Sequence, residues 1–131
     1  QLYQYSVFCA SFFYLYLGCR FIYKYLTFFF QLNKTVSSIT IFTLVFGTNL
    51  FYYSMYEPSM SHVYSFFCIS GFCYYGTKYF KVNSFKPLLI AAFFFTMVVM
   101  VRPVNAICIT FLPFLKIYIL LLLFHLFSNL T

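Results

Sequence analysis

The sequence LYQYSVFCASFFYLYLGCRFIYKYLTFFF, residues 2–30, decides the class of fold. It contains only two charged residues, Arg20 and Lys24, which are four apart and therefore share one face of a helix near the end of the run. A helix needs about 20 mostly apolar residues to cross a bilayer, so this run is long enough. Its two cations can extend toward one membrane surface. The first apolar run therefore predicts a transmembrane helix.

Four further apolar runs follow, and they indicate that the chain crosses the membrane repeatedly. Several are shorter than the usual span of about 20 residues, so we expect interfacial tyrosines or packing within a bundle to complete them. The last run contains Pro113 and Lys116, and it forms either one helix or a broken, re-entrant segment. We predict an all-α fold, a polytopic transmembrane bundle of about 4–6 helices in a single domain, residues 1–131. Its spans are 2–30, 39–53, 62–77, 87–101 and 104–127.

The composition supports a membrane protein and argues against a nucleic-acid partner. The chain is 64% hydrophobic and 7% charged, whereas a soluble domain has about 25% charged residues. The net charge of +7 comes from cations beside apolar runs, where they set topology and contact membrane lipid, and they form no basic stripe on a polar face. Because the chain begins at Gln1 and carries no domain outside the membrane, we expect a fragment of a larger membrane protein or a truncated product.

The distribution of lysine and arginine predicts the topology. Lys78, Lys81 and Lys86 mark one basic loop as cytoplasmic, and Lys34 marks the loop 31–38 as cytoplasmic too. These loops are two spans apart, so the two assignments agree. The loop around Glu57 then faces the periplasm or exterior, and Arg102, at the end of the fourth run, should lie at the same face. Two polar segments are thus expected to converge on one side of a bacterial inner membrane.

The first of these segments, residues 56–62, contains Glu57, the only acidic residue of the chain. Glu57 is either an ordinary solvated loop carboxylate or a ligand for a cation, a sugar hydroxyl or Arg102. Ser59 and Ser61 can cap the helix that follows. His62, at the start of that helix, is either an interfacial residue or a hydrogen-bond donor to a phosphate or hydroxyl.

The second segment contains Arg102 and Asn105 on either side of Pro103. A guanidinium suits phosphate because its fork offers paired donors and stays charged. Arg102 therefore either extends to the lipid headgroups or binds a lipid-linked phosphate at the membrane face. Asn49, near the exterior end of the second span, can line the same cavity, although Gly47 beside it also fits a small-residue packing face. The nucleotide-binding and hydrolase motifs that would suggest other enzymes are missing.

Three stretches together resemble a known family: GTNLFYY (47–53), EPSMSHVYSFF (57–67) and VRPVN (101–105). They are similar to bacterial membrane glycosyltransferases of the GT-C superfamily, including proteins like the protein O-mannosyltransferases and the lipid A aminoarabinose transferases. The subgroup they resemble most is found in Bacteroidetes-type bacteria. The resemblance covers roughly residues 8–114 and is more specific for the subgroup than for any substrate.

The resemblance implies a multi-pass enzyme that transfers a sugar from a polyprenyl-phosphate donor to an acceptor on the exterior face. It implies Glu57 as a catalytic carboxylate that activates the acceptor or holds a divalent cation, and Arg102 as a contact of the donor phosphate. His62 and Asn105 carry over as motif positions, and with Asn49 they complete the expected substrate-binding set. The family's aspartate, in its first exterior loop, has no counterpart, because the chain contains no Asp. A transporter, a flippase, a polymerase subunit or an inactive truncated product are the alternatives.

Overall fold

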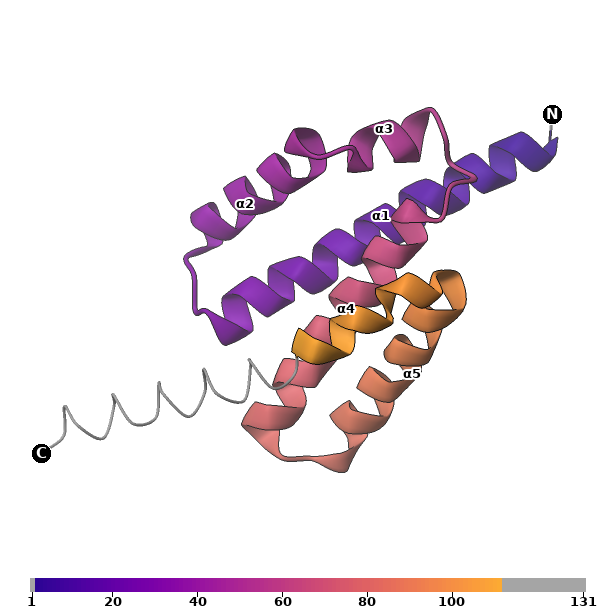
Figure 1. The fold of residues 1–131 in the computed structure, drawn as a ribbon. Helices are drawn as coiled ribbons and strands as arrows, with labels where there is room; N and C mark the ends of the chain where they lie inside the picture. Colours follow the sequence, from indigo (N-terminus) through magenta and orange to yellow (C-terminus); the bar gives the residue numbers. More distant parts are fainter. Residues whose placement is uncertain (1, 112–131) are drawn as a thin grey trace, which may run out of the picture.

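The computed structural model describes residues 2–111, and every regular element in that range is a helix (Figure 1). The all-α prediction is therefore confirmed for the described part of the chain. The elements are α1 (Leu2–Phe29), α2 (Lys34–Gly47), α3 (Leu50–Met55), α4 (His62–Val82), α5 (Phe85–Val101) and a 3-10 helix, η1 (Pro103–Thr110).

The centre of the fold is α4, which packs against α1 on one side and α5 on the other (Figure 1). Phe72 and Ala91 are 2% and 4% exposed and, with Phe94, form the core between α4 and α5. A glycine allows the two helices to approach here, because a Cβ on Gly71 would lie 2.6 Å from the Phe94 ring. Gly18 similarly lets α1 approach Phe66 of α4.

The expected second span, 39–53, is wrong as a single helix. The chain forms α2 and then the short α3, with a break at Thr48 and Asn49. Thr48 is extended, with φ −115° and ψ 169°, and its hydroxyl donates to the carbonyl of Leu44 over 2.6 Å. Thr40 and Thr43 make the same type of bond inside α2 without a break, so the helix end is marked by the extended backbone of Thr48 and not by its hydroxyl. Gly47 is exposed, so among residues 2–111 no helix packs on the small-residue face suggested for it.

The basic loop expected around Lys78, Lys81 and Lys86 is also wrong in its extent. Helix α4 continues through Lys78 and Lys81 to Val82, and only two residues separate it from α5. Asn83 ends α4 in the left-handed conformation, with φ 49°, which is a common helix terminator. The run expected at 104–127 begins as the short helix η1, and its part beyond residue 111, with Pro113 and Lys116, lies outside the described residues.

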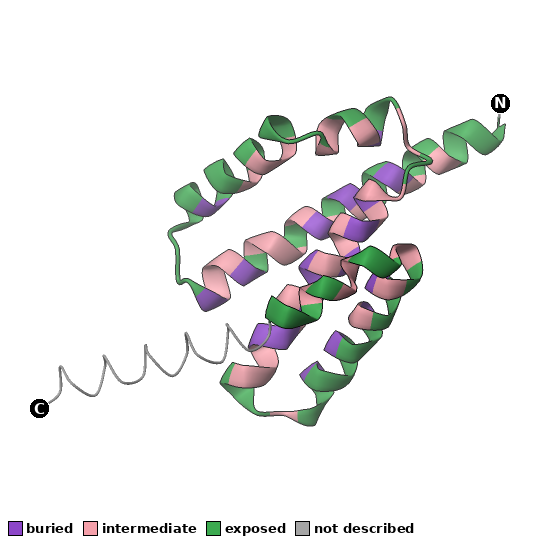
Figure 2. Cartoon of the chain, in the orientation of Figure 1, coloured by how far each residue is buried: buried purple, intermediate pink, exposed green. Residues whose placement is uncertain are grey.

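Among residues 2–111, α1 is the only helix both long and apolar enough to cross a membrane. Helices α2 and α5 are apolar but have 14 and 17 residues, fewer than the usual span of about 20. Much of the outer surface is nevertheless apolar, since most of α2 and the outer face of α5 are exposed (Figure 2). The structure thus gives one candidate membrane span, and the multi-pass bundle remains a prediction.

Within residues 2–111, the charged residues other than Arg20, which lies within α1, fall near one of the two ends of the bundle. The α3–α4 connection and the α5–η1 junction, with Glu57, His62 and Arg102, lie at one end, which we call the arginine end. The opposite end, where α1 and α4 finish and α2 and α5 begin, we call the lysine end. Its lysines are Lys24, Lys34, Lys78, Lys81 and Lys86.

Candidate functional site

The chain turns sharply at Arg102, which directly follows α5. Arg102 is extended, with φ −152° and ψ 113°, as expected for a residue before a proline. Pro103 then starts η1, whose first position needs no backbone N–H donor. This turn directs η1 back across the bundle and brings Arg102 to the beginning of α4 (Figure 1).

The guanidinium of Arg102 is held by two neutral side chains at the start of α4. Its Nε donates to Ser61 Oγ over 2.7 Å, and its Nη2 lies 3.4 Å from His62 Nε2. Because arginine has no acceptor, the imidazole must accept at Nε2 and carry its proton on Nδ1. Nη1 makes no hydrogen bond within residues 2–111. Within the described part of the chain, the cation is therefore held at two nitrogen atoms while its Nη1 has no partner.

Two further contacts fix the surroundings of Arg102. The His62 ring stacks on Tyr53 of α3, with centroids 4.1 Å apart and planes 20° from parallel. Asn105 Nδ2 donates to Ser65 Oγ over 3.2 Å, which ties η1 to α4. Four separate segments, α3, α4, the α5–η1 junction and η1, thus contribute to one polar cluster.

The polar cluster borders a pocket of about 370 Å³. Four residues proposed from the sequence line it together: Asn49, His62, Arg102 and Asn105. The remaining lining residues are Thr48, Leu50, Tyr53, Ser65, Phe66 and Ile69. We call this the arginine pocket. The two polar segments, expected to converge from topology alone, do meet here through their side chains.

Three residues of the polar cluster around Arg102 were not predicted as site residues from the sequence: Tyr53, Ser61 and Ser65. Ser61 was expected to cap α4, but it makes no capping hydrogen bond there and accepts from Arg102 instead. Ser65 is 7% exposed, one turn after Ser61 and on the same helix face. The spacing of Ser61 and Ser65 was the signal that a polar stripe of α4 faces the second segment.

Glu57 does not line the arginine pocket. It begins a tight turn, closed by a hydrogen bond of 3.0 Å from the Met60 N–H to the Glu57 carbonyl, with Pro58 at the second position that prolines favour. Within residues 2–111 its carboxylate makes no ion pair with Arg102, so the pairing considered from sequence is not formed. The turn keeps the only carboxylate apart from the cation.

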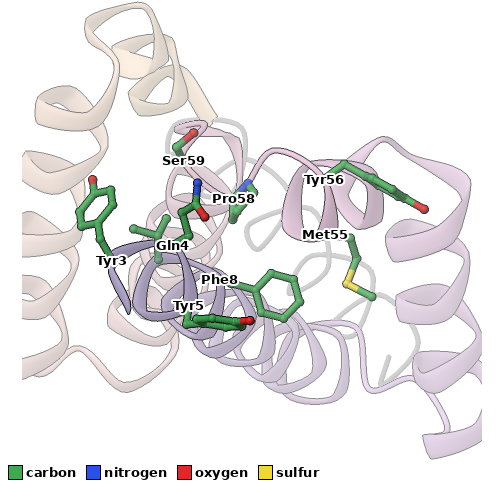
Figure 3. Close-up of a pocket in the computed structure, with 9 residues that line it drawn as sticks. Tyr3, Gln4, Tyr5, Phe8, Met55, Tyr56, Pro58 and Ser59 are labelled. Carbon is green, nitrogen blue, oxygen red and sulfur yellow. The ribbon is translucent and has the colours of Figure 1, made fainter. Parts of the chain in front are cut away.

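A second, larger pocket of about 830 Å³ lies beside the Glu57 turn (Figure 3). It is formed by the first turns of α1 together with the end of α3 and the turn, and Phe8 faces Met55 across it (Figure 3). Its lining is aromatic and uncharged: Tyr3, Gln4, Tyr5, Val7, Phe8, Met55, Tyr56, Pro58 and Ser59. We call it the aromatic pocket. The arginine pocket and the aromatic pocket have no residue in common, and of the two only the arginine pocket is lined by a charged residue.

The described residues do not fit a divalent cation. No three His, Cys, Asp or Glu side chains gather within residues 2–111, and Glu57 is the only carboxylate side chain. Divalent cations such as Mg²⁺ need several oxygen ligands. A cation bound here would therefore depend on groups other than those described.

Comparisons with known proteins leave the family open. No protein-family model, no curated protein and no solved structure matches the chain. The likeness to membrane glycosyltransferases accordingly rests on the three sequence stretches alone.

Proposed function

We propose that this chain is part of a multi-pass membrane glycosyltransferase and that its arginine pocket binds the phosphate of a polyprenyl-phosphate sugar donor. One observation carries the proposal: Ser61 and His62 hold Arg102 at the edge of a pocket, and within residues 2–111 the guanidinium has donors left over. A partly buried guanidinium that is oriented in this way and still offers donors is expected to bind an anion rather than to extend into the headgroups.

Phosphate is the ligand class that this arrangement favours. Arg102 offers directed N–H donors and a permanent charge, and the amides of Asn49 and Asn105 on the same wall add neutral donors. Hydrogen bonds to a charged group each contribute about 1.5–3 kcal/mol. Glu57, the only acidic side chain, is not in the pocket lining and so does not repel an anion.

The transfer reaction follows from the resemblance and uses both pockets. The acceptor hydroxyl attacks the anomeric carbon, the bond from that carbon to the lipid phosphate breaks, and the acceptor proton passes to the carboxylate of Glu57. Arg102 stabilises the charge that develops on the leaving phosphate. The sugar stays beside the donor phosphate to which it is bonded, and the aromatic pocket, which borders the Glu57 turn, is where we place the acceptor.

The proposal locates the protein in a bacterial inner membrane, with the arginine end on the exterior and the lysine end in the cytoplasm. The segregation of lysines supports this orientation. A non-catalytic protein that binds the same lipid phosphate, such as a transporter or flippase, would use the arginine pocket equally well, but it would not need Glu57. Loss of transfer in Glu57→Gln separates the two functions.

The first test measures binding of undecaprenyl phosphate, a polyprenyl phosphate, to the full-length protein in phosphatidylcholine nanodiscs. Undecaprenol, which has the same chain but no phosphate, is the matched ligand. We expect the phosphate to bind at least about tenfold more tightly, and Arg102→Gln to remove that difference. Equal binding of the two ligands would contradict the phosphate site.

The second test measures transfer of sugar from a polyprenyl-phosphate donor in membranes. We expect Glu57→Gln and Arg102→Ala each to reduce transfer by at least about tenfold without loss of membrane insertion. Of the two variants, only Arg102→Ala should also weaken the binding of undecaprenyl phosphate. Unchanged transfer in both variants would rule out the roles assigned to Glu57 and Arg102. If Glu57→Gln loses transfer but still binds undecaprenyl phosphate, the result supports a catalytic carboxylate.

A further inference from the structure

The seam between α1 and α4 gathers cations at the lysine end. Lys24 of α1 and Lys78 of α4 approach the same ring, with their Nζ atoms 6.0 Å and 5.9 Å from the centroid of Tyr74. The Tyr74 ring is itself packed on α1, 6.1 Å from Phe21 and 6.3 Å from Phe28 between centroids. Two positive charges on different helices are thus positioned around one fixed aromatic residue.

No anion within the described residues neutralises this pair. The only carboxylate side chain, Glu57, lies at the opposite end of the bundle. Lys24 and Lys78 make no hydrogen bond or ion pair within residues 2–111, and the Tyr74 hydroxyl donates to no group there. Lys81 differs, because its ammonium donates to the Phe28 carbonyl over 2.6 Å. Lys24, Lys78 and the Tyr74 hydroxyl therefore remain available for an external anion.

We propose that Lys24, Tyr74 and Lys78 form a binding site for the phosphate of an anionic membrane lipid at the α1–α4 seam. Basic pockets between membrane helices on the cytoplasmic side bind such headgroups, and each lysine near the surface contributes to the attraction. An inorganic phosphate offers the same chemistry, but the face of α1 that carries Lys24 also exposes the apolar rings of Phe13 and Tyr16, and a lipid's chains would lie along them. The inference rests on the proposed function only in placing the chain in a membrane.

The test uses the full-length protein in nanodiscs that contain four parts phosphatidylcholine to one part phosphatidylglycerol. Native mass spectrometry measures the ratio of the two lipids that stay bound. We expect phosphatidylglycerol to be enriched at least about fivefold over the nanodisc ratio. The double variant Lys24→Gln/Lys78→Gln should abolish the enrichment. Absence of enrichment in the unmodified protein would overturn the site.

A matched double variant, Lys34→Gln/Lys86→Gln, makes the same change in net charge at exposed lysines away from the seam. We expect this control to keep the phosphatidylglycerol enrichment. An equal loss of enrichment in both double variants would mean that net charge alone causes it, and would overturn the site. Tyr74→Phe keeps the ring and removes only the hydroxyl. It should lower the enrichment by about twofold, and an unchanged ratio would remove Tyr74 from the proposal.

Two further arms separate the sources of phosphate and the two ends of the molecule. Inorganic phosphate, added at constant ionic strength, should leave the bound lipid in place, and displacement would overturn the lipid assignment. Arg102→Gln should keep the phosphatidylglycerol enrichment, and Lys24→Gln/Lys78→Gln should keep undecaprenyl phosphate binding. These experiments can therefore contradict the lipid site at the α1–α4 seam without contradicting the phosphate site of the arginine pocket, and the reverse.

Discussion

The arginine end and the lysine end of this bundle both carry positive charge, but they hold it differently. Arg102 is fixed by hydrogen bonds to Ser61 and His62, which accept from defined nitrogen atoms. Lys24 and Lys78 instead lie over the face of Tyr74, about 6 Å away, in contacts that impose less direction. The directed hydrogen bonds at the arginine end suit one ligand bound in one orientation. The lysine end instead suits a phosphate that is held mainly by charge.

The difference arises from the local sequence. Pro103 forces an extended backbone at Arg102 and turns the chain, so that a single side chain is delivered to a site on another helix. Lys78 lies within α4 and reaches its position along the helix surface, without any special turn. A charge next to a helix break is thus placed by the backbone, and a charge within a helix is placed by its own flexible stem.

The core between the two ends offers the largest expected effect. In Gly71→Ala the new Cβ would meet the Phe94 ring at 2.6 Å, so we expect the free energy of unfolding to fall by about 1–3 kcal/mol. Helix α4 runs through this core and carries residues of both lipid sites. In Gly71→Ala we therefore expect lipid binding at the arginine end and at the lysine end to weaken together as the temperature rises. Chemical denaturation followed by circular dichroism measures the change.

Gly47→Ala is the matched control, because its Cβ would meet only Thr43, at 3.6 Å. We expect a change of less than about 0.5 kcal/mol in the free energy of unfolding. Equal destabilisation by both alanines would contradict the close approach of α4 and α5 at Gly71.

A pair of substitutions that keep charge tests the difference between the ends directly. Arg102→Lys retains the cation but cannot reach both Ser61 and His62 with a planar fork. We expect undecaprenyl phosphate to bind about tenfold more weakly. Lys78→Arg at the lysine end should change phosphatidylglycerol enrichment by less than about twofold. If both swaps were neutral, geometry would not distinguish the two ends.

The histidine of the arginine pocket should have a smaller effect. His62→Phe keeps an aromatic ring to stack on Tyr53 but removes the Nε2 acceptor for Arg102. The lost hydrogen bond has a charged donor but is long, at 3.4 Å. We therefore expect a loss of about 0.5–1.5 kcal/mol, and undecaprenyl phosphate to bind about twofold to tenfold more weakly. His62→Ala, which also removes the stacking, should weaken binding further. Equal affinities for the two variants would mean that the ring stack does not position Arg102.

The smallest expected effect concerns Lys81. Lys81→Met keeps the apolar stem and removes the hydrogen bond to the Phe28 carbonyl at the end of α1. We expect a loss of about 0.5–1.5 kcal/mol in the free energy of unfolding, with the two lipid sites unaffected. Lys86→Met, at an exposed position in α5, is the control and should leave stability unchanged.

The apolar runs predicted the helical fold because apolar content and length are properties of each segment alone. The break at Thr48 was missed, because a threonine does not by itself end a helix: Thr40 and Thr43 make the same hydroxyl bond inside an unbroken α2. The end of α4 was placed too early, because Lys78 and Lys81 resembled a loop, although lysine is a good helix former. Only Asn83, in the left-handed conformation, actually ends the helix.

For the candidate site, topology predicted which segments meet but not which side chains touch. Counting spans placed Glu57 and Arg102 at one face, and the fold brings their segments together. The contacts with Arg102 are made by Ser61 and His62, which follow the turn at Pro58, and not by Glu57. A turn geometry that changes the direction of one side chain cannot be read from hydropathy. The aromatic pocket, which joins the start of α1 to Tyr56, likewise depends on tertiary packing.

The orientation of the two ends across a membrane underlies both proposed lipid sites, and cysteine labelling tests it most directly. In a background with the five native cysteines replaced, Ser59→Cys marks the arginine end and Asn83→Cys marks the lysine end. A membrane-impermeant maleimide is applied to spheroplasts before and after permeabilisation. The account predicts that the cysteine at position 59 reacts in intact spheroplasts and the cysteine at position 83 only after permeabilisation. Labelling of both from the same side would contradict it.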